Sequence, residues 1–161
     1  MSSARSRHFD FCMDPLAILS FEGAFLDANR AWSTVMGWAP ENLQSQSFVN
    51  LLHPEDQPHF YSIIKTFLHD PTPLSFECRY RHNNGTYRFL IFDFVWDSEN
   101  HQIHAAGRDC TDFRRSRESM ATSQHQLEAV FSSMTEGVVA QDPTGQVVHF
   151  NQAALNIPTK S

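Results

Sequence analysis

Histidine and cysteine are the residues of this sequence whose chemistry could build a metal or redox site. The chain has 161 residues, among them nine histidines and three cysteines. His101 and His104 are three residues apart, but no cluster of acids or cysteines completes the four-ligand set of a structural zinc ion. Cys12, Cys78 and Cys110 are odd in number and widely spaced, which favours reduced thiols over a disulfide framework. We therefore expect no metal site and a cytoplasmic protein.

Catalytic motifs are also absent from the sequence. It contains no G-x-S-x-G nucleophile motif, no H-E-x-x-H zinc motif and no glycine-rich phosphate loop. The formal net charge is −6 without a long run of Lys or Arg, so the basic surface that nucleic acid requires is missing. No apolar stretch approaches the roughly 20 residues that span a bilayer. We expect this segment to be no enzyme, to bind no nucleic acid and to make no membrane contact.

The first elements that must position any site are a hairpin and a long helix. Two apolar runs flank Glu22-Gly23 and predict a hairpin, after which Asn29 is expected to cap a short helix. The stretch His53-Pro54-Glu55-Asp56 has the proline and acids typical of a helix start. Apolar residues then recur at helical spacing until Asp70-Pro71 ends the helix.

Three strands are expected to follow this helix. Residues 76–81 alternate between apolar and charged side chains, which indicates a strand with one buried face. Asn84-Gly85 predicts a tight hairpin turn, and residues 87–96 are apolar on both faces of the next strand. Residues 103–109 are expected to form the third of these strands. The fold class is therefore α+β, with a five-stranded antiparallel sheet, helices on one face and a connector helix after it.

An internal repeat explains the end of the chain. The stretch DPTGQVVHFNQAA near the C-terminus resembles the opening of a domain rather than its close. Shifting the sequence by 122 positions places Phe9 on Phe131, Gly23 on Gly145, Asn29 on Asn151 and Ala31 on Ala153. The apolar residues of the first hairpin fall on apolar residues of the second. We expect a truncated second copy and a chain cut from a longer tandem array.

Four stretches together resemble the PAS domain with its C-terminal PAC half: GAFLDANRAWSTVMGW, LLHPED, FECRYRHNNGTYRFL and GRDCTDFRRSRE. Asp109-Cys110-Thr111 is similar to the closing Asp-Ile-Thr motif of that family, with Cys in place of the aliphatic residue. The expected organisation is a lead-in at residues 1–13, a PAS/PAC domain at 14–112, a helical connector at 113–130 and the truncated start of a second PAS domain at 131–161.

The resemblance implies a sensory and dimerisation module of a multidomain signal-transduction protein, whose downstream part would be a histidine kinase or a cyclic-dinucleotide enzyme. The alternative is a receptor domain for haem, flavin or a metabolite. His59 and His69 are poorly placed on the long helix for a haem ligand, and the stretch NLQSQSFVN lacks the reactive cysteine of flavin-binding relatives. We therefore expect no bound cofactor.

A ligand pocket would lie between the long helix and the sheet, although its phenylalanines favour a filled core. Its expected lining is Phe60, Ile64, Phe67, Phe76, Cys78, Tyr80, Phe89 and Ile91. The opposite face of the 87–96 strand would expose a large apolar patch unless the N-terminal segment or a partner subunit covers it. That patch is Leu90, Phe92, Phe94 and Trp96. We therefore expect a homodimer.

The connector has the features of a signal-relaying helix. Phe113, Met120, Leu127 and Met134 recur every seven residues, the period of a coiled-coil seam, while most other seam positions are polar. Thr111 or Asp112 is expected to cap this helix where the last strand ends. Asp109, Thr111 and Asp112 are thus the predicted relay residues between the domain and the downstream parts of the same chain.

Overall fold

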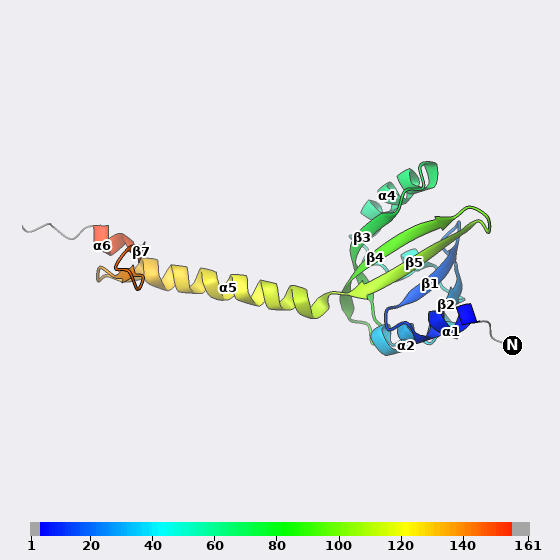
Figure 1. Cartoon of the computed structure of the whole chain (residues 1–161), viewed down its shortest axis with the longest axis horizontal. Coiled ribbons are helices and arrows are strands. Elements are labelled where there is room, and N and C mark those ends of the chain that lie inside the picture. The colour runs from blue at the N-terminus through cyan, green and yellow to red at the C-terminus, as the bar shows by residue number, and fades with distance from the viewer. Residues whose placement is uncertain (1–3, 156–161) are drawn as a thin grey trace, which may run out of the picture. The chain divides into compact units, whose positions relative to one another are not determined.

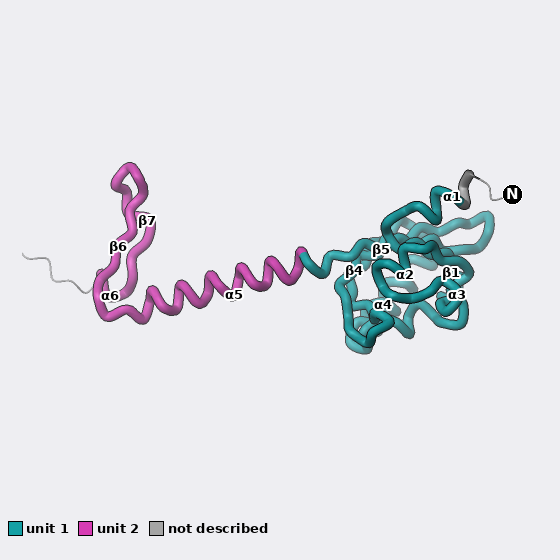
Figure 2. Tube along the Cα trace, turned by 90° about the horizontal axis from the view of Figure 1, so that it is seen from below, with its two compact units in different colours: residues 1–112 teal, residues 113–161 magenta. Residues whose placement is uncertain are grey.

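The computed structural model describes residues 4–155 of the chain, and the side chains from residue 7 onward. It divides into two compact units, residues 1–112 and 113–161, which are described separately (Figure 2). Within the described residues, no helix is both long enough and apolar enough to cross a membrane.

The first unit is an antiparallel sheet with helices (Figure 1). The N-terminal half contains α1 (Ala4–Phe11), β1 (Leu16–Ser20), β2 (Phe25–Ala28), α2 (Ala31–Met36), α3 (Pro40–Leu43), the 3-10 helix η1 (Phe48–Leu51) and α4 (Gln57–His69). The C-terminal half contains β3 (Leu74–Arg81), β4 (Tyr87–Asp97) and β5 (Gln102–Asp109). The five strands have the order β2-β1-β5-β4-β3. The predicted α+β fold with a five-stranded antiparallel sheet is therefore confirmed.

The core lies between one face of this sheet and the helices. Buried side chains from α2, α3, η1 and α4 join the inner residues of all five strands in a single apolar cluster. Trp32, Phe48 and Phe92 are among its fully buried members. Gly107 on β5 makes room for one of them, because a Cβ there would come within 2.5 Å of the Phe92 ring.

The β3–β4 hairpin corrects the prediction of which β4 residues face the core. A tight turn centred on Asn84-Gly85 would pair Asn83 with Thr86 and place Cys78 opposite Ile91. Instead, His82 pairs with Thr86, and the loop has one more residue, with Gly85 at φ 86°. Cys78 therefore lies opposite Leu90. A shift of one residue exchanges the two faces of a strand.

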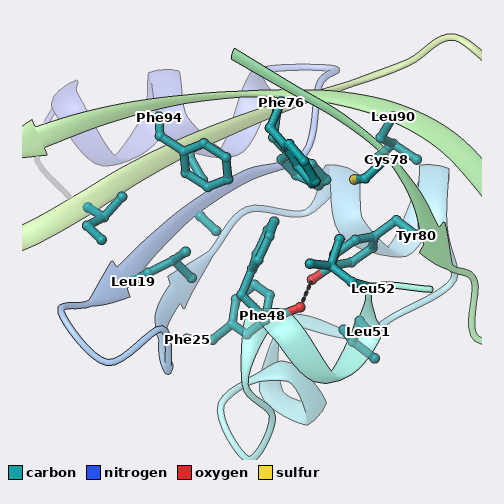
Figure 3. Packing of buried hydrophobic residues seen from close by; sticks show 14 of the residues in the cluster. Leu19, Phe25, Phe48, Leu51, Leu52, Phe76, Cys78, Tyr80, Leu90 and Phe94 are labelled. Atoms are coloured by element: carbon teal, nitrogen blue, oxygen red, sulfur yellow. Dashed lines mark hydrogen bonds between the residues drawn. The ribbon is translucent and has the colours of Figure 1, made fainter. Parts of the chain in front are cut away.

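As a result, the predicted exposed patch is wrong. Leu90, Phe92 and Phe94 are fully buried against the helices, and Trp96 packs against the same cluster. The predicted pocket residues Phe89 and Ile91 point to the other face of the sheet, where they are half-buried. Figure 3 shows Leu90 on the same side of the sheet as Phe76 and Cys78.

Two local predictions about helix starts also need correction. Residues 54–56 form a turn, and α4 begins only at Gln57, with Pro58 in its first turn. Asn29 does not cap α2 with its side chain; Arg30 occupies the cap position without a side-chain bond. The Asn29 side chain, which is fully buried, turns back toward α1 and β1 instead.

The second unit repeats the first hairpin. It contains most of α5 (Thr111–Ser133), then β6 (Val139–Gln141), β7 (Val147–Phe150) and α6 (Gln152–Leu155). Ala17 pairs with Ala28, and Val139 pairs with Phe150. The pairing register then shifts at the same point of each hairpin, between Ile18 and Leu19 in the first and between Ala140 and Gln141 in the second. These pairs differ by 122 residues (139 − 17 and 150 − 28), so the structure supports the predicted repeat.

The hydrogen bonds of two asparagines follow the same offset. Asn29 Oδ1 accepts from the Leu16 amide at 2.9 Å, and Asn151 Oδ1 accepts from the Val138 amide at 2.9 Å. Asn29 Nδ2 donates to the Asp14 carbonyl at 3.0 Å, and Asn151 Nδ2 donates to the Glu136 carbonyl at 2.8 Å. Each asparagine follows the second strand of its hairpin and binds the backbone at the start of the first strand.

Candidate functional site

The centre of the predicted pocket is filled by aromatic rings. Phe48 lies at its middle, with ring centroids 4.9 Å from Phe92, 5.0 Å from Tyr80 and 5.5 Å from Phe60. The Tyr80 hydroxyl donates to the Phe48 carbonyl at 3.0 Å (Figure 3). Burial raises the pKa of Tyr80 well above its usual value, so this hydroxyl stays a donor. Aromatic side chains in mutual contact therefore occupy the centre of the core.

The other predicted pocket residues on this side are part of the same packing. Phe67, Phe76 and Cys78 are buried, and Ile64 is half-buried against the cluster. Burial raises the pKa of the Cys78 thiol, which keeps it protonated and unreactive. Cys78 thus acts as a small core residue.

A cavity of about 190 Å³ lies to one side of this aromatic centre. It is bounded by α4, η1, the β1–β2 turn and the inner faces of β4 and β5. Its lining is Leu19, Phe21, Glu22, Gly23, Phe48, Val49, Phe60, Tyr61, Ile64, Leu68, Phe94 and Ile103. Only Phe60 and Ile64 belong also to the predicted lining. Pockets that bury drug-sized ligands measure about 300–1,000 Å³, so this one is too small for haem or flavin.

The predicted relay residues are brought together where β5 meets α5. Asp109 binds Arg88 of β4 at 2.8 Å and accepts from the Thr111 amide at 2.9 Å. Desolvation opposes ionisation of Asp109, but its hydrogen bonds with Thr111 and Arg88 hold its pKa below the usual value. The carboxylate therefore remains charged and joins β4 to the first residue of α5.

Thr111 departs from the predicted helix cap. Its hydroxyl accepts from the Phe89 amide at 2.9 Å, so it bonds strand β4 rather than the helix. Thr111 is buried, whereas Asp112 is an exposed acid in the first turn of α5, where the helix dipole favours a negative charge. Of the three predicted relay residues, two hold α5 to the sheet.

A second polar link, missed from the sequence, joins α4 to β3. Asp56, at the start of α4, accepts from the Arg79 backbone amide at 2.8 Å and from its guanidinium at 2.6 and 3.1 Å. Glu55 lies 2.9 Å from the same guanidinium. The side-chain bond from Arg79 is the main reason why the pKa of Asp56 lies below its usual value. The sequence feature that could have pointed to this link was the predicted outward position of Arg79 on its strand.

The predicted coiled-coil residues on α5 are exposed. Phe113, Met120 and Leu127 are 66%, 73% and 71% exposed, while Met134 follows the end of the helix.

The histidines considered for haem, His59 and His69, are exposed on α4 and lie outside the cavity lining.

Comparison with known families identifies the fold. The family described as PAS fold matches residues 25–107, more than half of the chain. The chain belongs to the PAS family. A further match, described as PAS domain, covers residues 125–157 and includes the repeated hairpin. A PAS domain followed by a partial second PAS region is therefore confirmed. No curated protein matches the chain.

Solved PAS structures agree with this fold at low identity. A domain of a sensory box sensor histidine kinase/response regulator from Geobacter sulfurreducens is 20% identical, with a TM-score of 0.59 and coverage of 66% of this chain and 91% of its own. The PAS domain of a Colwellia psychrerythraea protein is 24% identical, with a TM-score of 0.59 and coverages of 67% and 95%. The PAS domain of the RpfR quorum-sensing receptor from Cronobacter turicensis, in complex with BDSF, is 17% identical, with a TM-score of 0.55 and coverages of 62% and 96%.

Proposed function

We propose that this PAS sensory domain relays changes in its core to α5, as part of a homodimeric, cytoplasmic signal-transduction protein. The parent would be a histidine kinase or a cyclic-dinucleotide enzyme. The observation that carries the proposal is the bond between Thr111 and Phe89, supported by the Asp109–Arg88 pair. Strand β4 holds core residues on its inner face, and the same strand holds the first residue of the outgoing helix.

The repeat supports a second step of this relay. Shifted by 122 residues, α1 (Ala4–Phe11) corresponds to residues 126–133, which are the last residues of α5. In the first copy Asn29 Nδ2 donates both to Phe9 O near the end of α1 and to Asp14 O. In the second copy Asn151 Nδ2 donates to Glu136 O, the equivalent of Asp14, three residues after α5 ends. One helix would thus leave the first PAS domain and enter the second.

A register test in a chimera examines the relay. The chain replaces the sensor of a histidine kinase, and residues are inserted near Ser119, which lies within α5. One inserted residue rotates the following helix by about 100° and should change kinase output, whereas seven residues restore the phase to within about 20° and should restore output. Equal output from both insertions would mean that α5 is only a tether.

The cavity favours a second candidate function, that of a small-molecule receptor. Two structural neighbours contain small molecules: the Cronobacter turicensis domain was solved with BDSF, and the Drosophila melanogaster Cycle PAS-B domain with ethylene glycol. Here the ligand would occupy the side cavity next to Phe48, since aromatic rings fill the centre of the core.

A further inference from the structure

The side cavity has an almost entirely apolar wall. Leu19, Ile103 and Phe94 contribute from the sheet, and Ile64 and Leu68 contribute from α4. Figure 3 shows Leu19, Phe48 and Phe94 pointing toward one another at the edge of the aromatic core. Among the described residues, every buried side-chain nitrogen and oxygen already has a hydrogen-bond partner. The buried part of the wall therefore has no unpaired polar side-chain atom with which to bind a polar ligand, and the polar side chains of the lining, Glu22 and Tyr61, are both exposed.

The volume sets the size of any occupant. A cavity of roughly 150 Å³ lined by Leu, Ile and Phe stays dry in water and binds benzene. At about 190 Å³, the present cavity is slightly larger and has the same kind of lining. It matches a single six-membered ring with a short substituent.

The charged group of the lining comes from the β1–β2 turn. Glu22 is exposed and lines the cavity beside Gly23, and Tyr61 of α4 is exposed as well. A carboxylate at this position repels an anion that approaches, and the apolar interior gives an anion no compensating partner. Neutral molecules face neither cost.

We propose that the cavity binds an uncharged apolar molecule of about the size of toluene and discriminates against carboxylates. This inference rests on the receptor function proposed above and names its ligand class. Binding would be sensed through Phe94, because this cavity residue belongs to β4, the strand that holds Thr111 at the start of α5.

Toluene and benzoate form a matched pair of probes, since they share a ring and differ in charge. We expect toluene at ten times its dissociation constant to raise the melting temperature of the intact chain by about 5 °C. Amide resonances of Val49, Ile64 and Ile103 should shift in a nuclear magnetic resonance titration. Benzoate at equal concentration should do neither. The proposal is wrong if toluene at its solubility limit has no effect, or if benzoate binds as tightly.

Filling the cavity supplies the control. Ile64→Phe should abolish the toluene effect, and Val49→Phe is a second filling variant in case the first does not fold. Leu26→Phe makes the same kind of enlargement at an exposed position of β2 outside the lining and should bind toluene normally. Unchanged toluene binding in a folded filling variant would place the site elsewhere and overturn the proposal.

Removing the charge tests the selectivity. Glu22→Gln should leave the affinity for toluene within about twofold and raise that for benzoate by about threefold, the effect of one charge about 6 Å away in water. No gain in affinity for benzoate would contradict the role of Glu22.

These tests measure binding to the isolated chain, whereas the insertion test measures kinase output. If the proposed ligand class is wrong, the proposal that α5 relays a signal is unaffected. If the relay proposal is wrong, the toluene-binding result is unaffected.

Discussion

Asn29 and Asn151 make equivalent hydrogen bonds within two copies of one hairpin, but Asn29 also binds the preceding helix α1, whereas Asn151 also accepts from the Ala154 amide of the following helix α6. Asn29 Nδ2 donates to the carbonyl of Phe9 at 3.0 Å and lies 3.4 Å from that of Cys12. Asn29 therefore fixes the end of α1 to the sheet from a fully buried position.

Replacing Asn29 with Ala should strongly destabilise the first unit. The change leaves buried amide and carbonyl groups without partners, at about 1–3 kcal/mol for each group left unpaired. We expect the urea midpoint of the first unit to fall and protease cleavage near α1 to rise. Asn151→Ala is the matched control, since it removes the equivalent side chain from the other unit. Equal loss of stability in the first unit from both changes would contradict this assignment.

The link between Asp56 and Arg79 should make stability depend on pH. The folded pKa of Asp56 lies below its unfolded value of about 3.9, so the contribution is complete above that value and disappears as pH falls through the folded pKa. Asp56→Asn should therefore destabilise the protein by about 2 kcal/mol at pH 7, with a smaller difference from wild type at pH 3. Urea unfolding at both pH values measures this.

Glu55→Gln is the control for this prediction. Glu55 contacts the same guanidinium but its side chain is 74% exposed, and exposed ion pairs contribute about 0–1 kcal/mol. If both variants lose equal stability at pH 7, or if the effect of Asp56→Asn does not shrink at pH 3, the partly buried hydrogen bonds between Asp56 and Arg79 are not the cause.

The first hairpin and its repeat could be predicted because their signals are local. Gly23 and Gly145 both adopt positive φ, as a short turn between apolar runs requires. The β3–β4 register could not be read from Asn84-Gly85 alone, because turns with two and with three loop residues both accept this pair. The better signal was on β4, where Asp93 and Asp97 share one parity and mark it as the outer face.

Contacts between distant segments were beyond sequence patterns. Asp56 and Arg79 are 23 residues apart, and nothing in their spacing brings them together before α4 is placed against β3. The cavity likewise depends on how the aromatic side chains pack, which composition does not determine. Fourteen phenylalanines predicted a filled core, and the structure has a filled centre with a small cavity beside it.

Gly107→Ala should disrupt the centre of the core. The new Cβ would approach the Phe92 ring to within 2.5 Å, and overpacking of this kind costs about 1–3 kcal/mol. We expect a fall of about 5–15 °C in the melting temperature. Ala106→Ser is a neighbouring control on the half-buried outer face and should change it little. An unchanged melting temperature for Gly107→Ala would show that Phe92 can move aside freely.

The Thr111 bond should control the local stability of the start of α5. Thr111→Val removes the acceptor for the Phe89 amide while keeping the shape of the side chain. Hydrogen exchange at Phe89 and in the first turn of α5 should accelerate about tenfold, as expected for the loss of one hydrogen bond worth about 1.4 kcal/mol. Thr122→Val, whose hydroxyl donates to Glu118 on the exposed part of α5, should leave these sites unchanged. Equal acceleration in both variants would mean that helix propensity, rather than the bond to β4, sets the exchange rate.

The exposed stripe of α5 should contribute to the proposed homodimer. Met120 is 73% exposed at a seam position, and a second copy of the helix would bury it against its own equivalent. Met120→Glu would place two carboxylates opposite each other and should weaken self-association at least tenfold in sedimentation equilibrium. Thr122→Glu adds the same charge about 200° around the helix and should weaken it much less. Because half of the seam positions are polar, we expect dissociation in the micromolar range. A wild-type chain that stays monomeric at tens of micromolar, or equal effects of the two substitutions, would show that α5 is not the surface through which two copies associate.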